Sequence, residues 1–287
     1  MLLEPCDGVS RGDDLAFVFI FILPPKHELV KQLTGSLVIQ PFSTKSHAKI
    51  IVADSKDGSF FAVVGSCNWL SSGFHSYEAS AVVRDATIVA DVVGKFADVA
   101  FYHSWEWSDL RNELLGLSGR LRDMPTKGPV KGRAAVVAGA QHNQFMLRAR
   151  DEARKQIFVM SHRLGASATP SVITPMSAAV SDKKIQADIF FSRTTYPVPQ
   201  RIKGKIIETA ALQGVKAEPI QTPRLHAKVL GWDDDCLLIT SLNWLSADPM
   251  SSSDPKEVGL WIQAPGIARH LLTHFQAARA AGQLDEY

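Results

Sequence analysis

The sequence predicts an α/β protein built from two halves related by a pseudo-twofold axis, each a mixed β-sheet flanked by helices. Apolar, strand-like runs alternate with helical stretches along the chain, which is the pattern of α/β architectures. One block of sequence also occurs twice, about 179 residues apart. The 287 residues are long enough for one large domain or two smaller ones.

The first half is expected to span residues 15–119 and to begin with a strand at 15–23, a helix at 25–33 and a strand at 37–40. The run at 15–23 is too short to cross a membrane, which takes about 20 apolar residues. Acidic residues precede it and no small-residue cleavage site follows, so it is not predicted to be a signal peptide. We expect residues 1–14 to be disordered or outside the core, because this half begins one strand and one helix later than the second.

The second half is expected to span residues 136–287 and to hold the fuller set of elements. Periodicity and length separate its helices from its strands. The predicted elements are a helix at 143–155, a strand at 156–161, a strand at 187–192, a helix at 199–212 and a strand at 215–220.

A basic linker, residues 120–135, is predicted between the halves. The segment RLRDMPTKGPVKGR at 120–133 combines five basic residues and one acid with two prolines and two glycines. Such runs are mostly solvated connectors, which is the favoured interpretation here. The alternative is a strap that contacts phosphate groups.

Composition narrows the classes of function. Lys and Arg total 31 against 29 for Asp and Glu, a net charge of +2, which excludes binding by bulk positive charge of the histone type. It leaves room for a local basic patch over a phosphate substrate. The cysteines Cys6, Cys67 and Cys236 are too few for a disulfide framework, so a reducing cytoplasm is the expected location.

The repeated block has two parts. Residues 46–54 align with 225–233 at an offset of 179, and residues 65–71 align with 240–246 at an offset of 175. The difference of four residues falls between the parts, where hairpin turns absorb insertions. An acid follows each repeated asparagine, by 10 residues at Glu78 and by 14 at Glu257.

The repeated residues suit chemistry on a phosphodiester. His and Lys two positions apart on a strand face the same side. The Ser-x-Asn segment, on the hairpin partner, can bring an amide beside them. Two such sets would let one imidazole attack phosphorus and the other protonate the leaving oxygen, while lysines and asparagines hold the remaining oxygens. The lysines supply the charge a metal ion would otherwise give, so neither metal nor other cofactor is predicted. A single His-x-Lys carries little information, but two with identical spacing are not accidental.

These blocks resemble the signature of the phospholipase D superfamily, His-x-Lys-x4-Asp followed by Gly-Ser-x-Asn. The first copy matches in full, with His47, Lys49, Asp54, Gly65, Ser66 and Asn68. The second copy has Thr240 where glycine is usual and otherwise matches, with His226, Lys228, Asp233, Ser241 and Asn243.

The resemblance implies a covalent phosphohistidine intermediate, with His47 as the nucleophile and His226 as the general acid. It also implies that Glu78 and Glu257 orient the histidines through the other ring nitrogen. The motif aspartates Asp54 and Asp233 are expected to brace the hairpins.

Further residues are predicted with less support. Strand ends border the cleft in α/β sheets, which favours substrate contact by residues that end two predicted strands. The predicted substrate-binding set is Ser66, Ser241, His162, Arg163 and Arg193. Trp69 and Trp244 follow the two asparagines and are interpreted as core wedges rather than base-stacking platforms.

Three functions remain open. The Asn-Trp-Leu-Ser continuation in both copies is similar to bacterial nuclease-like members, often tied to helicases or defence systems, and favours a metal-independent nuclease on DNA or RNA. Phospholipid synthases of this type usually carry a different continuation, but a lipid phosphodiesterase or phosphatidyltransferase is the second reading. A non-catalytic nucleic-acid-binding module of a larger protein is the third. The expected partners are nucleic acid and a helicase or other partner domain, with no membrane.

Overall fold

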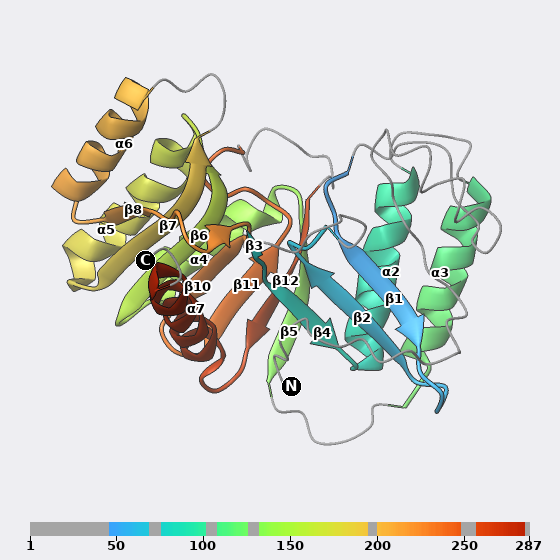
Figure 1. The fold of residues 1–287 in the computed structure, drawn as a ribbon. Helices are drawn as coiled ribbons and strands as arrows, with labels where there is room; N and C mark the ends of the chain where they lie inside the picture. Colours follow the sequence, from blue (N-terminus) through green and yellow to red (C-terminus); the bar gives the residue numbers. More distant parts are fainter. Residues whose placement is uncertain are drawn as a thin grey trace.

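The computed structural model describes residues 46–68, 76–101, 108–125, 132–194, 200–247 and 257–284 (Figure 1). The elements predicted at 15–23, 25–33 and 37–40 lie outside the described residues, as does the segment 1–14.

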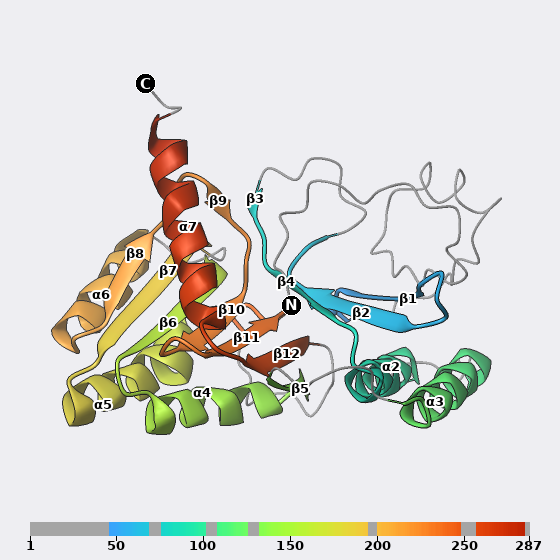
Figure 2. The same cartoon turned by 90° about the horizontal axis from the view of Figure 1, so that it is seen from below.

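The first half forms a three-stranded antiparallel sheet covered by two helices. The strands lie in the order β1 (Ile50–Asp54), β2 (Phe60–Gly65) and β4 (Ser80–Val83). Helices α2 (Ala86–Phe101) and α3 (Ser108–Arg122) lie together under one face of this sheet (Figure 2). Buried residues of α2 recur at helical spacing, at Val89, Val92, Val93 and Phe96, which gives the helix its apolar contact face.

The second half forms a seven-stranded mixed sheet in the order β5-β12-β11-β10-β6-β7-β8. Strands β6, β7 and β8 pair in parallel, and the remaining pairs are antiparallel. The bounds are β5 Arg133–Ala138, β6 Gln156–Leu164, β7 Gln186–Thr194, β8 Lys216–Pro219, β10 Val229–Trp232, β11 Cys236–Thr240 and β12 Val258–Gln263. The α/β class is therefore confirmed, with a mixed sheet in the second half, whereas the described strands of the first-half sheet pair only antiparallel.

Helices cover both faces of this sheet. Helices α4 (Gln141–Glu152) and α5 (Thr174–Lys183), the latter continuing a π-helical turn at Thr169–Ile173, lie on one face, and α7 (Ile267–Leu284) lies on the other (Figure 2). Helix α6 (Gln200–Leu212) packs through Ile206 into the same core as α4 and α5.

Side chains of β6 alternate between two cores. Ile157 and Val159 pack into the core under α4 and α5, while Phe158 and Met160 face the core under α7. That second core also contains the buried residues of β2, β4 and α2 from the first half. The two halves therefore share one apolar core.

The elements predicted for the second half differ from the observed ones mainly at their ends, but β5, β12, α5 and α7 were not predicted. The helix predicted at 143–155 is α4, and it ends at Glu152; the strand predicted at 156–161 is β6, and it continues to Leu164. The predicted linker, 120–135, was too long, because α3 runs to Arg122 and β5 begins at Arg133. Residues 126–131 of it lie outside the described residues.

Candidate active site

Two hairpins hold the repeated motifs in the same way. His47 and Lys49 immediately precede β1, and His226 and Lys228 immediately precede β10. The Gly65 N–H donates to the Lys49 carbonyl (3.2 Å), and in the second copy the Thr240 N–H donates to the Lys228 carbonyl (3.0 Å). These matching bonds place each Ser-x-Asn segment beside its lysine.

Each histidine is paired with a carboxylate from the other half. His47 Nδ1 lies 3.0 Å from Glu257 Oε1, and His226 Nδ1 lies 2.6 Å from Glu78 Oε1. Nδ1–H donates to the carboxylate, which leaves Nε2 of each ring for chemistry. The orienting role predicted for the two glutamates fits this geometry, and the crossing between halves is an addition that the sequence did not predict.

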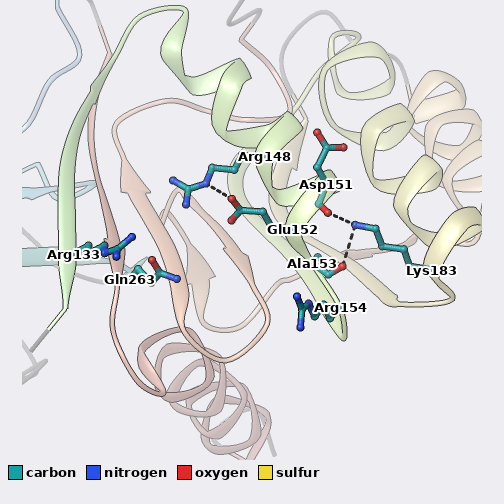
Figure 3. Close-up of a pocket in the computed structure, with 8 residues that line it drawn as sticks. All are labelled: Arg133, Arg148, Asp151, Glu152, Ala153, Arg154, Lys183 and Gln263. Carbon is teal, nitrogen blue, oxygen red and sulfur yellow. Dashed lines mark hydrogen bonds and ion pairs between the residues drawn. The ribbon is translucent and has the colours of Figure 1, made fainter.

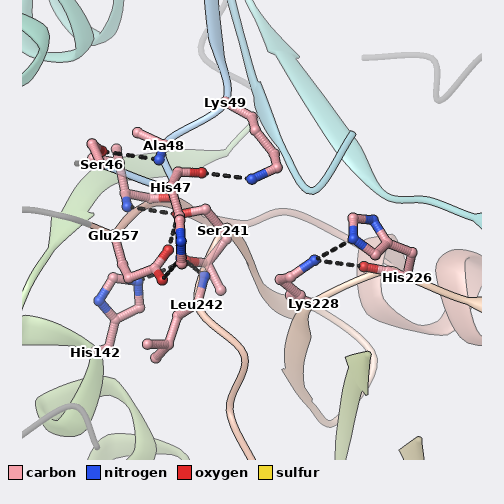
Figure 4. Close-up of polar contacts among 12 residues, drawn as sticks. Ser46, His47, Ala48, Lys49, His142, His226, Lys228, Ser241, Leu242 and Glu257 are labelled. Atoms are coloured by element: carbon pink, nitrogen blue, oxygen red, sulfur yellow. Dashed lines mark hydrogen bonds and ion pairs between the residues drawn. The ribbon is translucent and has the colours of Figure 1, made fainter. Parts of the chain in front are cut away.

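The repeated serines hold these glutamates in place. The Ser66 hydroxyl donates to Glu78 Oε2 and the Ser241 hydroxyl to Glu257 Oε2, each at 2.5 Å (Figure 4 for Ser241). Each hydroxyl also accepts a backbone N–H, from Ala79 at 3.1 Å and from Val258 at 3.0 Å. Both serines are buried, at 0% and 1% exposure, so the structure makes them supports of the carboxylates instead of the substrate contacts predicted from sequence.

The two lysines lie beside their histidines and influence one another. Lys49 Nζ donates to the His47 carbonyl (2.7 Å), and Lys228 Nζ donates to the His226 carbonyl (2.9 Å) and lies 3.4 Å from His226 Nε2 (Figure 4). Burial lowers the pKa of both ammonium groups. The pKa of Lys228 falls to about 7, because burial is reinforced by the positive charge of Lys49.

One carboxylate from each half opposes this lowering of the lysine pKa values. Glu78 and Glu257 each raise the pKa of both lysines. Charges that act on one another in this way lie around a common space, so the structure brings together the histidines, lysines and glutamates predicted from sequence. The result is a small site with two ammonium groups and two imidazoles, which suits an anionic substrate.

The two histidines differ in their surroundings. The side chain of His47 is 58% exposed, whereas that of His226 is 16% exposed. The Tyr77 carbonyl accepts the backbone N–H of His226 (2.9 Å) and of Ala227 (2.8 Å). Tyr77 belongs to β3 (Ser76–Tyr77) of the first half, which pairs in parallel with β9 (Arg224–Leu225) and fixes the chain that leads into His226.

Thr240 fits where glycine is usual because its cross-strand neighbour is a glycine. Gly65 pairs with Ser80 in the first copy, and Thr240 pairs with Gly259 in the second. A Cβ added at Gly65 would lie 2.1 Å from the Ser80 hydroxyl, and one added at Gly259 would lie 2.8 Å from the Thr240 Cβ. Each pair therefore has room for one side chain, and the two copies place it on opposite strands.

Sequence reasoning missed His142, whose ring contacts the Thr240 side chain that stands where glycine is usual. His142 Nδ1 donates to the Gly139 carbonyl (2.8 Å), and its Nε2 lies 2.7 Å from the Thr240 hydroxyl. Burial lowers the pKa of His142, so the neutral ring accepts the hydroxyl proton at Nε2. Nothing local in the sequence indicates this contact, because the two residues are 98 positions apart.

The asparagines and aspartates of the motifs have different environments. Asn68 is exposed, whereas Asn243 Oδ1 is buried without a hydrogen-bond partner among the described residues. Asp233 accepts the backbone N–H groups of Arg154 and Lys155, in line with a bracing role. Asp54 ends β1.

The predicted substrate contacts on β6 and β7 lie at the ends of those strands. Arg163 is exposed, and its backbone pairs with Arg193, whose side chain lies outside the described part of the structure. His162 is 5% exposed and packs against His226, so it is not open to a substrate. Trp244 is buried as predicted, at 1% exposure, and Trp69 lies outside the described residues.

None of these groups lines the surface cavity of about 710 Å³ whose lining residues are drawn in Figure 3. It is lined by Arg133, Arg148, Asp151, Glu152, Ala153, Arg154, Lys183 and Gln263. Gln263 ends β12, and Glu257 precedes the start of that strand, a separation of about 20 Å along an extended strand. Arg148 is paired with Glu152, and Lys183 donates to the Asp151 carbonyl, so much of the positive charge is already engaged.

The described residues contain no group of three or more His, Cys, Asp or Glu side chains arranged to hold a metal ion. They also contain no helix of the length and apolar character needed to span a membrane.

Comparison with known proteins bears on the fold. No protein-family model and no curated protein sequence matches the chain. Among solved structures, phosphatidylserine synthase from Haemophilus influenzae matches 87% of this chain and 67% of its own, with a TM-score of 0.52 at 12% identity. The phospholipase D family member Nuc from Salmonella typhimurium matches 51% of this chain and 94% of its own, with a TM-score of 0.41 at 20% identity. NucT from Helicobacter pylori matches 51% and 95%, with a TM-score of 0.39 at 11% identity.

The chain shares the fold of the phosphatidylserine synthase. Membership of the phospholipase D superfamily stays a prediction from the two sequence motifs. At these identities the likeness concerns the fold alone, and the chemistry of the site rests on the side chains described above.

Proposed function

We propose that the chain is a metal-independent phosphodiesterase that cleaves DNA or RNA through a phosphohistidine intermediate. The observation that carries the proposal is the pair of crossed His–Glu contacts, which leaves the Nε2 atoms of two imidazoles for chemistry in a site that also holds the half-buried Lys49 and the buried Lys228. A nucleophile, a general acid and fixed positive charge are the groups that phosphodiester cleavage needs.

The proposed reaction has two steps. His47 Nε2 attacks phosphorus and forms the P–N bond while the bond to the leaving oxygen breaks, and His226 gives that oxygen its Nε2 proton. In the second step His226 takes a proton from water, whose oxygen attacks phosphorus and breaks the P–N bond. Glu257 and Glu78 keep both rings in the Nδ1–H form throughout, and each carboxylate stabilises its ring when the ring is positively charged.

The lysines have the electrostatic role in this proposal. Their ammonium groups stabilise the non-bridging oxygens as negative charge develops on them, in a site where burial makes such contacts stronger than in water. Asn68 and Asn243 contribute amide N–H groups to the same oxygens. This arrangement is why no metal ion is included in the proposal.

A nucleic-acid substrate is favoured by the charges at the rim. Arg163 is exposed at the end of β6, its backbone pairs with that of Arg193, and its charge acts on the buried Lys228. Arginines next to a phosphate-cleaving centre suit the neighbouring phosphates of a polymer, and binding through them weakens with salt. A cytoplasmic location and a helicase or other nucleic-acid-handling partner remain parts of this proposal.

The decisive experiment incubates the purified protein with labelled single- and double-stranded DNA and RNA in excess EDTA. His47→Ala and His226→Ala are expected to abolish cleavage. His270→Ala is the matched control, because His270 is an exposed histidine on α7, and it should cleave like the wild type.

Three other outcomes of this experiment would contradict the proposed function or its mechanism. Binding of nucleic acid without cleavage by the wild type would indicate the non-catalytic module. Activity on phospholipid mixed micelles, without cleavage of nucleic acid, would indicate the lipid phosphodiesterase or phosphatidyltransferase. Cleavage by both alanine variants at the wild-type rate would contradict the mechanism itself.

A further inference from the structure

A third histidine lies directly against one of the two site histidines. His162, on β6, meets the ring of His226 edge to face, with ring centroids 4.7 Å apart and an interplanar angle of 68°. Its Nδ1–H donates to the carbonyl of Leu225, the residue before His226, at 2.9 Å. With 5% exposure, His162 holds both the ring of His226 and the backbone that carries it.

Burial, together with the charges around this pair, keeps His162 neutral. Burial is the main cause that lowers its pKa, to about 4, and the nearby positive charges of His226, Lys228 and Arg163 act in the same direction. On the other side of His226 the carboxylate of Glu78 accepts Nδ1–H. His226 therefore lies between an acceptor that stabilises its charged form and an uncharged ring that adds no repulsion. The charges of Lys49 and Glu257 also act on neighbouring Lys228, whose pKa Lys49 lowers and Glu257 raises.

His47 has no such neighbour among the described residues. Its side chain is 58% exposed against 16% for His226, and β1 is the edge of the described three-stranded sheet. In the second half β6 lies next to β10 and supplies His162. The apolar run at 15–23, predicted as the first strand of the first half, contains no histidine and lies outside the described residues.

We propose that His162 is a positioning residue that acts through His226 alone, fixing its ring against Glu78 and keeping water away from it. The kinetic part of this inference rests on the proposed function. A ring already held in its reacting orientation loses little freedom when it transfers a proton, which lowers the barrier of that step. In this proposal the fold holds the ring of the proton donor, His226, in place, whereas the ring of the nucleophile, His47, is more exposed to solvent.

Three substitutions separate the contributions of His162. His162→Ala removes both the ring and the hydrogen bond, His162→Phe keeps a ring without a donor, and His162→Asn keeps a donor toward Leu225 without a ring. The exposed His270→Ala is the control for loss of a histidine. Thermal unfolding of every variant shows whether the fold is retained, and His162→Phe serves where His162→Ala does not fold.

The first readout needs no substrate. Proton NMR follows the low-field Nδ1–H signal of His226, identified by its loss in His226→Ala, and titration of the His226 ring gives its pKa. We expect His162→Ala to speed exchange of this proton with water at least ~10-fold, with a smaller effect in His162→Phe, because loss of a supporting contact opens the site to solvent. An unchanged signal and ring pKa in both variants would overturn the proposal.

The second readout is turnover of bis(p-nitrophenyl) phosphate. His162→Ala is expected to lower kcat about 10–100-fold at nearly constant KM and to shift the limb of the pH profile that reports the general acid, with partial rescue in His162→Asn. A raised KM at unchanged kcat would instead make His162 a substrate contact and would overturn the proposal. If no protein, wild type included, cleaves any phosphodiester, the proposed function fails while the NMR readout still decides the role of His162.

Discussion

Replacing Lys228 by methionine should make the protein more stable and less active. Lys228 is 2% exposed, and its pKa falls from 10.5 to about 7 because burial and the charge of Lys49 disfavour its ammonium form. At about 1.4 kcal/mol per pKa unit, keeping this charge costs the folded state at most about 5 kcal/mol at pH 7. Loss of the hydrogen bond to the His226 carbonyl and imperfect packing of the new side chain each offset about 1 kcal/mol.

The expected net gain for Lys228→Met is therefore about 1–3 kcal/mol at pH 7, measured by denaturant unfolding. In a chain of this size it raises Tm by about 2–4 °C per kcal/mol. The unfolded chain keeps this proton up to about pH 10.5 while the folded chain loses it near pH 7, so the unfolded state binds more protons in between. The stability of the wild type then rises through that window, and the advantage of the variant shrinks toward pH 10.

The assay pairs unfolding curves at pH 7 and pH 9.5 with phosphodiesterase rates. Lys205→Met, at an exposed position of α6, is the control and should change stability by less than about 0.5 kcal/mol. Activity of Lys228→Met should fall about 10²–10³-fold, as for loss of one donor to a developing anion. A variant that is destabilised at pH 7, or whose advantage is the same at both pH values, would refute the reasoning.

Three further predictions follow from other contacts. Glu78→Gln and Glu257→Gln should each lower kcat about 10²–10⁴-fold. In NMR spectra, Glu78→Gln should change the ring signals of His226 and leave those of His47 unchanged. A change at His47 instead would contradict the crossed pairing. The free energy of unfolding should fall by on the order of 2–3 kcal/mol as the pH drops from about 6.5 to about 4, because His162 becomes protonated in the unfolded chain but not in the folded chain. This pH dependence should be weaker in His162→Phe. The same pH dependence in the wild type and the variant would exclude His162 as its source. Gly259→Ala should lower the free energy of unfolding by about 1–3 kcal/mol, because its Cβ would lie 2.8 Å from the Ile239 carbonyl oxygen and 2.8 Å from the Thr240 Cβ. Gly119→Ala in α3, where no atom lies within 4 Å of the new Cβ, should be neutral or stabilising. Equal effects in denaturant unfolding would show that the close contact at Gly259 is relieved at no cost.

The sequence predicted the parts of the site that local geometry decides. His and Lys two positions apart before a strand face one side wherever that strand lies, and a hairpin partner follows from the chain's own turn. No pattern predicted β5 or β12, whereas the α/β class and the strands β6, β7 and β8 followed from local periodicity. Their exact ends did not, because β6 continues to Leu164 only through pairing with β7.

Contacts that depend on how distant segments dock were not predictable. Nothing near Glu78 in the sequence says that it meets His226, 148 positions away. The fit of Thr240 likewise depends on the register that places Gly259 opposite it. The sequence predicted His162 as a substrate contact, whereas its burial behind His226 follows from strand order, which no local pattern encodes.

The crossed carboxylates also bear on how such a two-copy chain can change over time. A repeated motif ordinarily provides a spare, so that one copy can accumulate substitutions while the other continues to work. Here each copy contributes the imidazole of one pair and the carboxylate of the other. A lesion in either copy therefore damages a pair that the intact copy shares, and the repetition brings no redundancy. Both copies stay under selection together, while exchanges that preserve the joint geometry, such as the glycine that changes strands between them, remain free to occur.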